Sequence, residues 1–425
     1  MVAPQSIPAM TTCPHCWNQF APQDVKWISM HPDLRDDTKV PEGSRRFLPT
    51  RFDTRCRALD VRGEPCTELA CPRCHLVMPR DVIEMEPTFY SILGAPSSGK
   101  SYFLTAALWR LRSILRQRFS VTFEDSDPVS NRKVHEYEET LFLNTARSQH
   151  VALPKTELEG DLYEQVEIEP DRVMLLPRPF VFRARLSEEH PRVNVRRQNG
   201  RAVCLYDNAG EHFFPGADTA NSPGTRHLAV AKALLFVFDP TQHAAIRERC
   251  SAMSDDPQLR ENQSSNRQDH ILAEATRRIR AELGLPQNRR DPRPLIVVLS
   301  KFDAWKGLFD DKDLQEEWAY TSVPGEPSRL NLDNLTTISG RCRELLTQLA
   351  PEIVSTADAF SEHVIFIPVS ALGCSPVEIP GLPTNTGPTP LGVRPGDINP
   401  VWAEVPLMYA MQQTIPGLIG GSRPK

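Results

Sequence analysis

The pattern of apolar residues changes near position 90, from a short run typical of a buried strand to a helical repeat. Residues 88–93, Thr-Phe-Tyr-Ser-Ile-Leu, are β-branched and aromatic enough to predict a buried strand. Shortly afterwards, Leu104, Leu108, Leu111 and Leu115 recur at helical spacing. The pattern therefore predicts a strand, a short turn and a helix, in that order.

Further apolar runs predict strands that close on polar residues. These runs are residues 179–186, 201–207, 294–299 and 363–369. Residues 131–144 are predicted to form an inserted helix, and residues 401–413 a closing helix packed back on the sheet. Prolines crowd residues 375–400, which are predicted to form loop and not core.

The turn after the first strand is bounded by glycines and carries one lysine. It reads Gly-Ala-Pro-Ser-Ser-Gly-Lys-Ser over residues 94–101, matching G-x-x-x-x-G-K-[ST] at every fixed position. Inward N–H groups and the helix N-terminus favour phosphate, while Lys100 reaches its terminal groups and Ser101 ligates Mg²⁺. A polyphosphate nucleotide is the predicted ligand. A chance glycine-rich turn is the alternative, but strand, motif and helix coincide.

The strand at 201–207 ends in an acidic motif, Asp207-x-x-Gly210. A carboxylate at a strand end can hold Mg²⁺ through water, and a glycine N–H can meet the γ-phosphate of a nucleotide. The motif is weak by itself, because a strand-end Asp can simply cap the following helix.

Two later strand ends bear on the identity of the base. The first closes on Ser300-Lys301-x-Asp303, where a carboxylate can accept from both N1–H and the 2-amino group of guanine, which adenine lacks. The second closes on Ser370-Ala371, whose backbone N–H groups could reach the guanine carbonyl. The joint pattern favours guanine.

In this order the motifs resemble those of the P-loop GTPases, in the translation-factor-like and Ras-like class. The resemblance runs from Pro87 to Ala410. It implies an α/β fold, a mostly parallel sheet with helices on both faces, that binds GTP, GDP and Mg²⁺ and hydrolyses GTP. It assigns nucleotide binding to Gly94, Ser97, Ser98, Gly99, Lys100, Ser101, Tyr102, Lys301, Asp303, Ser370 and Ala371, and Mg²⁺ to Ser101 and Asp207.

The chain departs from this family pattern in three places. Ser300 stands where the family has Asn or Thr, and Glu211 where many members have a Gln that orients the attacking water. Slow or differently assisted hydrolysis is therefore expected. Of Thr140, Thr145 and Thr156, the last is favoured as the switch threonine, because it lies in a polar loop before a strand. The predicted catalytic set is Lys100, Thr156, Gly210 and Glu211, and residues 213–227 are predicted to form a second switch loop.

Two C-x-x-C turns mark the N-terminal region. Their thiolates, from Cys13, Cys16, Cys71 and Cys74, are predicted to bind Zn²⁺ as a zinc ribbon, with Cys56 and Cys66 as alternates. No basic start or apolar core of a signal peptide opens the chain, so a reducing cytoplasm is expected and disulfides are disfavoured. A redox C-x-x-C is disfavoured because neither copy lies in a βαβ pattern.

Charge and hydropathy exclude other functions. The chain has 425 residues and a formal net charge of −5, and residues 1–90 carry 11 basic against 12 acidic side chains. This balance does not support general adhesion to nucleic acid or anionic membranes, and the arginines of residues 190–201 are predicted to lie on a solvated hairpin. No apolar run approaches the 18 residues of a membrane span.

The sequence therefore predicts a zinc-ribbon-like domain over residues 1–86 and a GTPase domain with insertions over 87–425. The combination, with Cys-Pro-Arg-Cys-His at 71–75, resembles bacterial double-GTPases. Two functions stay open: a GTP-hydrolysing switch with the ribbon as docking module, and a scaffold that binds GTP with little hydrolysis. An ATPase is a third and weaker option. A protein partner is expected at the switch loops or the ribbon.

Overall fold

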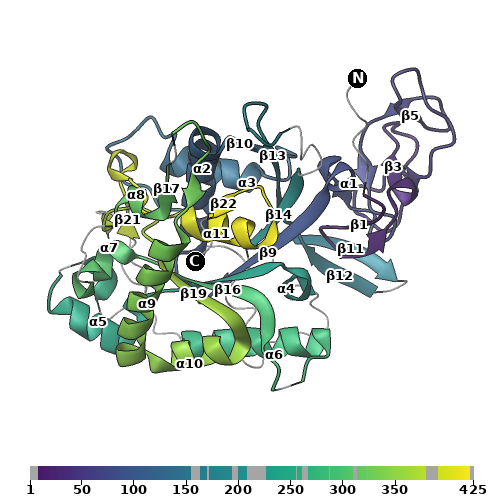
Figure 1. Ribbon diagram of the computed structural model, residues 1–425. Coiled ribbons are helices and arrows are strands. Elements are labelled where there is room, and N and C mark those ends of the chain that lie inside the picture. The colour runs from purple at the N-terminus through teal and green to yellow at the C-terminus, as the bar shows by residue number, and fades with distance from the viewer. Residues whose placement is uncertain are drawn as a thin grey trace.

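The computed structural model shows an α/β body and a smaller N-terminal lobe (Figure 1). It describes residues 8–154, 163–169, 172–193, 200–207, 226–254, 256–260, 267–286, 288–309, 314–322, 324–379 and 391–421. Within these residues a mostly parallel sheet is covered by helices on both faces, which confirms the fold class expected from the sequence.

Within the described residues, the central sheet has seven strands in the order β10-β13-β14-β9-β15-β16-β19. Their bounds are β9 Glu86–Gly94, β10 Val121–Asp125, β13 Phe180–Leu186, β14 Arg201–Asp207, β15 Ala233–Phe238, β16 Asp291–Leu299 and β19 Ser361–Pro368. The pairs from β14 to β19 are parallel, whereas β13 pairs antiparallel with both β10 and β14. The carboxyl ends of five parallel strands therefore meet at one edge.

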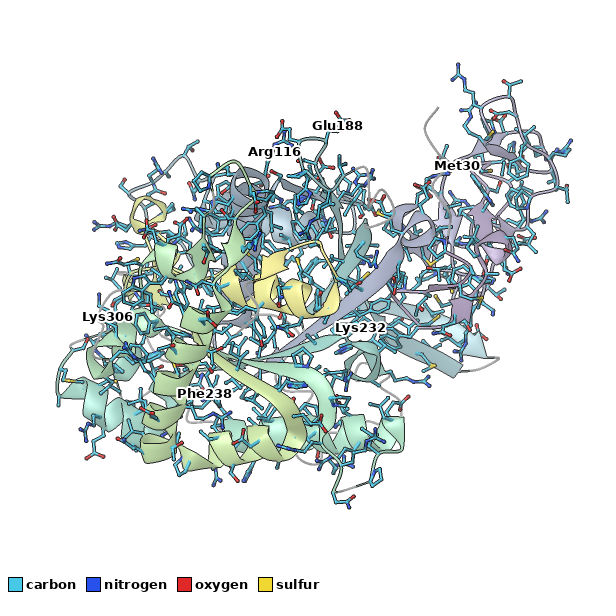
Figure 2. The ribbon with its side chains drawn as sticks, in the orientation of Figure 1. Met30, Arg116, Glu188, Lys232, Phe238 and Lys306 are labelled. Carbon is cyan, nitrogen blue, oxygen red and sulfur yellow. The ribbon has the colours of Figure 1, made fainter. Side chains whose placement is uncertain are left out.

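One core strand, β15, was not predicted from the sequence. Its six residues, Ala-Leu-Leu-Phe-Val-Phe, are all buried between β9 and β16, and Phe238 at its end is marked in Figure 2. Such a short, continuous apolar run is the signature of a strand covered on both faces. The strand matters because it carries Asp239 to the edge where the predicted site residues lie.

Helices cover both faces of the central sheet. Contacts place α2 and α11 on one face, with α3 outside α2, and α4, α6 and α10 on the other, with α9 beside β19 (Figure 1). The helices are α1 Asp81–Glu84, α2 Lys100–Phe119, α3 Arg132–Leu141, α4 Arg226–Val230, α5 Ala244–Ser251, α6 Gln268–Leu283, α7 Phe302–Trp305, α8 Glu316–Ala319, α9 Leu332–Leu349, α10 Pro351–Phe360 and α11 Val405–Thr414. The inserted helix and the closing helix are thus present as predicted.

The N-terminal lobe is built from very short strands. They are β1 Thr11–Thr12, β2 Gln19–Phe20, β3 Lys26–Ile28, β4 Arg46–Phe47, β5 Ala58–Leu59, β6 Pro65–Cys66, β7 Leu69–Ala70 and β8 Val77–Met78. A hairpin of β11 Tyr163–Glu169 and β12 Arg172–Pro177 joins this lobe, because Val166 and Leu176 are buried in the same apolar cluster as its cysteines. The lobe's core therefore draws on residues beyond 86.

Residues 375–400 were predicted to be loop, and most of their described part is irregular, apart from a short strand pairing, a buried bridge and a 3₁₀ turn. β20 Val377–Glu378 pairs with β21 Leu391–Gly392, and Val393 is buried in a bridge to Val151. A further small sheet joins β17 Tyr320–Thr321, β18 Arg329–Leu330 and β22 Gly420–Gly421. Among the helices that the structure describes, none combines the length and apolarity needed to cross a bilayer.

Candidate functional site

The phosphate loop leaves β9 at Gly94 and enters α2 at Lys100. Gly94 has φ of +156°, and a Cβ there would lie 2.4 Å from the carbonyl oxygen of Val237 on neighbouring β15. Gly99 has φ of +88° and Ser97 has φ of +60°, so the loop turns through left-handed conformations before the helix begins. Glycine is required at position 94 because the loop passes so close to β15.

Lys100 is buried inside the curve of this loop. Its Nζ donates to the carbonyl oxygens of Gly94 at 3.0 Å and Ala95 at 2.7 Å. The ammonium group is therefore held at the mouth of α2, where an anion also gains from the helix N-terminus. Ser98 Oγ is buried without a hydrogen-bond partner in the described part of the chain. The loop has the donors that a phosphate would need.

Ser101 and Asp207 meet although 106 residues separate them. Ser101 Oγ donates to Asp207 Oδ2 at 2.9 Å, and Asp207 Oδ1 is buried without a hydrogen-bond partner among the described residues. Burial raises the pKa of Asp207, although Lys100 and the Ser101 hydrogen bond act in the opposite direction. A hydroxyl and a buried carboxylate with an unused oxygen fit Mg²⁺, which prefers oxygen ligands.

Asp303 and Ser370, which were predicted to bind the base of the nucleotide, also contact each other. Ser370 Oγ donates to Asp303 Oδ1 and accepts from the backbone N–H of Gly373 at 2.8 Å. Gln258, which the sequence did not predict, donates from Nε2 to Asp303 Oδ2 at 3.4 Å. Burial raises the pKa of Asp303 to about 6. Ala371 follows Ser370 and is half-buried.

Ser300 joins the phosphate end of this edge to the base end. Its hydroxyl donates to the carbonyl oxygen of Ser98 in the phosphate loop at 2.8 Å. The departure from Asn or Thr at this position therefore retains a hydrogen bond across the site. Lys301 has φ of +55°, and its Nζ lies 2.6 Å from Oδ2 of the buried Asp239.

Two neighbours of the phosphate loop were also not predicted from the sequence. Asp239 directly follows β15, the strand that was not predicted from the sequence. Without that strand, the ion pair between Asp239 and Lys301 could not be predicted. Gln242, in the turn after β15, donates from Nε2 to the carbonyl oxygen of Pro96 at 3.1 Å. The apolar run of β15 was the available signal for both residues.

Of the remaining residues that were predicted to bind or hydrolyse the nucleotide, the structure describes only some. Tyr102 Oη accepts from the backbone N–H of Leu153 at 2.8 Å, so the described chain before Thr156 reaches the start of α2. Thr156, Gly210 and Glu211 lie outside the described residues, as does most of the predicted second switch loop. Their roles stay predictions.

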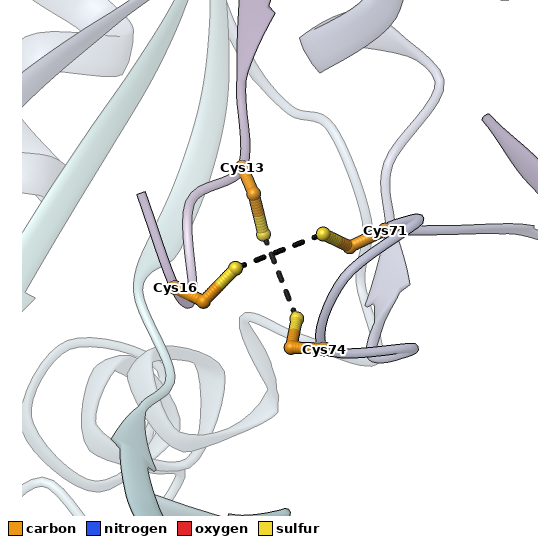
Figure 3. A group of neighbouring side chains, drawn as sticks. All are labelled: Cys13, Cys16, Cys71 and Cys74. Carbon is orange, nitrogen blue, oxygen red and sulfur yellow. Dashed lines mark hydrogen bonds between the residues drawn. The ribbon is translucent and has the colours of Figure 1, made fainter. Parts of the chain in front are cut away.

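Four cysteines converge in the N-terminal lobe (Figure 3). The Sγ atoms of Cys13 and Cys74 are 3.8 Å apart and those of Cys16 and Cys71 are 3.7 Å apart. Tetrahedral zinc with bonds of about 2.3 Å requires sulfur separations of about 3.8 Å. All four side chains are buried, and hydrogen bonding with the Cys13 and Cys16 thiols lowers the pKa of Cys71.

The two alternate cysteines lie apart from this cluster. Cys56 is exposed, and Cys66 Sγ is placed 3.6 Å from the carbonyl oxygen of Glu64. Backbone N–H groups of His15 and Arg73 instead point at Cys13 and Cys71, at 3.4 and 3.3 Å. The donor set and its spacing fit Zn²⁺.

The cysteine turn packs directly on the strand that carries Asp207. Trp17 Nε1 donates to Tyr206 Oη at 3.0 Å, and Tyr206 Oη donates to the carbonyl oxygen of Pro14 at 2.5 Å. The Tyr206 ring stacks on His227, at the start of α4, with centroids 4.7 Å apart. The lobe thus rests beside the residue predicted to hold Mg²⁺.

Comparison with known proteins supports this architecture. The family described as Double-GTPase 2 matches residues 190–357, which confirms the resemblance to P-loop GTPases of the double-GTPase type. A protein of Mycolicibacterium smegmatis, described as "Putative ESX-1 scaffolding and assembly protein SaeC", is 25% identical over 326 residues, covering 71% of this chain and 72% of the relative.

Solved structures similar to the chain include three that contain a bound nucleotide. The Ski7 GTPase-like domain of S. cerevisiae bound to GTP is 14% identical with a TM-score of 0.26, covering 67% of this chain and 43% of that one. Sup35 with GDP is 13% identical with a TM-score of 0.24, covering 68% and 38%. Era with MgGDPNP and 16S ribosomal RNA is 13% identical with a TM-score of 0.23, covering 72% and 62%. The chain spans less than two thirds of each.

Proposed function

We propose that this chain binds GTP with Mg²⁺ at the carboxyl edge of the central sheet, hydrolyses it to GDP and acts as a nucleotide-dependent switch. One observation carries the proposal. The Ser300 hydroxyl links the phosphate loop to the segment between β16 and α7, the helix that bears Asp303, so the groups proposed to bind phosphate and to read the base lie along one continuous edge. The family match at residues 190–357 supports the same function.

Each part of this edge has a distinct task. Lys100 supplies positive charge to the terminal phosphates, and Ser101 with Asp207 would hold Mg²⁺, which neutralises phosphate charge when bound. Asp303 accepts from the guanine edge while the loop at Ser370 and Ala371 faces its carbonyl. Gly210 is proposed to meet the γ-phosphate, and Thr156 and Glu211 to assist hydrolysis, at a rate lowered by the missing Gln.

The N-terminal lobe is proposed to bind Zn²⁺ through Cys13, Cys16, Cys71 and Cys74. Its place beside Tyr206 suits a docking module whose position depends on the nucleotide site. A protein partner would bind this lobe or the switch loops, in the cytoplasm. The net charge of −5 gives no support for a nucleic-acid partner.

A scaffold that binds GTP but hydrolyses little is the second candidate. Two observations favour it: Glu211 replaces the usual Gln, and the relative from M. smegmatis is described as a scaffolding and assembly protein. Phosphate release separates the two candidates, because only the switch turns GTP over. An ATPase is disfavoured by the half-buried Asp303 carboxylate, to which adenine offers no donor.

Lys100→Ala tests the phosphate site, since it removes a charge and leaves the apolar core intact. Calorimetry should show tight GTP binding to the wild-type chain and to Lys232→Ala, an exposed control marked in Figure 2, but not to Lys100→Ala. Unchanged GTP affinity in a folded Lys100→Ala variant would contradict the proposed phosphate site. Phosphate release by the wild type, measured in parallel, supports the switch, and its absence supports the scaffold.

A further inference from the structure

Two side chains from separate elements hold the two oxygens of the Asp303 carboxylate. Ser370 Oγ donates to Oδ1, from the loop after β19. Gln258 Nε2 donates to Oδ2 at 3.4 Å. Gln258 belongs to a 3₁₀ turn, Pro257–Leu259, in the segment between β15 and α6. Nothing in the sequence motifs connects this segment to base recognition.

Gln258 is held firmly in this position. Its backbone N–H donates to Asp256 Oδ1 at 2.8 Å, while Asp256 Oδ2 accepts from Ser375 Oγ. Leu259, the next residue, is buried in the main apolar core. The Gln258 side chain is itself buried, so its amide is ordered by its surroundings before any nucleotide arrives.

The number of donors around Asp303 has a chemical consequence. An ionised carboxylate has two oxygens and about four positions that accept hydrogen bonds. Among the described residues, Ser370 bonds Oδ1 and Gln258 bonds Oδ2, and the backbone N–H of Asp303 itself also favours the ionised carboxylate. Each oxygen is therefore oriented by a side chain, and the two oxygens together suit two adjacent donors, such as the N1–H and 2-amino groups of guanine.

The order of groups on the guanine edge assigns each donor to one oxygen. The carbonyl comes first, N1–H second and the 2-amino group third. Because the loop at Ser370 and Ala371 faces the carbonyl, Oδ1 on the Ser370 side meets N1–H. Oδ2, the oxygen bonded by Gln258, then meets the 2-amino group.

We propose that Gln258 is a specificity-determining residue, which positions Asp303 Oδ2 to accept the 2-amino group of guanine. The inference rests on the proposed function, because it requires that Asp303 read guanine. It adds a residue from the segment between β15 and α6 to the base site, and it predicts an effect confined to one functional group of the base.

Inosine triphosphate isolates that group, because hypoxanthine keeps N1–H and lacks the 2-amino group. In Gln258→Met, a substitution of similar shape without an amide, the dissociation constant for GTP should rise about tenfold, as expected for one lost hydrogen bond. The dissociation constant for ITP should stay within about twofold of wild type. ITP is also an internal reference for folding, since it needs the same folded site.

Ser370→Ala is the matched control on the other oxygen. It should weaken GTP and ITP binding by similar factors, because both bases carry N1–H. Equal weakening of GTP and ITP in Gln258→Met would show a merely structural role and overturn the inference. Unchanged or tighter GTP binding in that variant would also overturn it. A wild-type chain that binds GTP and ATP equally would instead contradict the proposed function itself.

Discussion

Buried charged residues cluster at one edge of this molecule. Lys100, Asp207 and Asp239 carry their charges into the buried interior and Asp303 is half-buried, and such burial is costly unless partners are present. Two of them have a pKa raised by burial, and such perturbed groups gather preferentially at functional sites. Their positions at strand ends explain how residues distant in sequence become neighbours.

Motifs predicted Lys100, Asp207 and Asp303, but neither Asp239 nor all of the partners of these residues. Lys100, Ser101 and Asp303 lie in patterns whose spacing encodes their chemistry. Gln258 could not be predicted, because its contact with Asp303 depends on where the 3₁₀ turn Pro257–Leu259 lies in the folded chain. The hydrogen bond of Ser300 could not be predicted either. The sequence shows a hydroxyl at this position but does not show that it donates to the carbonyl oxygen of Ser98.

The pKa of Asp303 predicts how GTP affinity depends on pH. Near pH 6 the free carboxyl is half protonated, whereas guanine binds only the ionised form. The complex therefore holds fewer protons than the free protein, so affinity should fall about tenfold per unit below pH 6 and level off above pH 7. Asp256 opposes ionisation of Asp303 and Lys301 favours it.

The matched comparison for this pH dependence is Asp303→Asn measured with the same GTP. Protonation of the γ-phosphate affects both proteins equally, so the difference between their slopes reports Asp303 alone. A wild-type slope no steeper than that of Asp303→Asn between pH 5 and 7 would contradict the assigned pKa.

At the scale of elements, strands were predicted where a polar motif followed an apolar run. β9, β14, β16 and β19 were found in this way, whereas β15 was missed although its run of six apolar residues was the available signal. The short β20–β21 pairing was missed for a different reason. Prolines and glycines indicate turns reliably, but a two-residue strand depends on partners such as Val151 that are remote in sequence.

The junction of β9 and the phosphate loop predicts a strong effect for Gly94→Ala. The added methyl would meet the backbone of Val237, which cannot rotate away, so we expect a loss of about 1–3 kcal/mol of stability and much weaker GTP binding. Gly340→Ala in α9 is the control, because its Cβ would meet nothing within 4 Å. Thermal unfolding that is unchanged for Gly94→Ala would refute the close approach.

At the scale of the whole molecule, the N-terminal lobe meets the body at Tyr206. The cysteine turn meets its hydroxyl, and His227 stacks on its ring. The β11–β12 hairpin adds a second link, since its side chains complete the lobe's core. A boundary drawn from cysteine spacing could not include this hairpin, because its apolar residues carry no metal-binding signal.

Zinc removal should therefore unfold the lobe. The purified chain should contain about one zinc per molecule, and Cys71→Ser should lose it and become sensitive to protease in the N-terminal region, because structural zinc supplies folding energy. Cys56→Ser, outside the cluster, should keep both zinc and resistance. Protein purified without chelator and found to be free of zinc would count against the site.

The central claim is that this edge reads guanine, and a nucleotide competition between wild type and Asp303→Asn tests it most directly. The wild-type carboxylate accepts two hydrogen bonds from guanine, each worth about 1.5 to 3 kcal/mol. The dissociation constant for GTP should therefore be lower than that for ATP by a factor on the order of a hundred or more. In Asp303→Asn the amide can donate to the 2-oxo group of xanthine, and preference should move from GTP toward XTP. Equal affinity of the wild-type chain for GTP and ATP would contradict the guanine assignment, even with an intact phosphate loop.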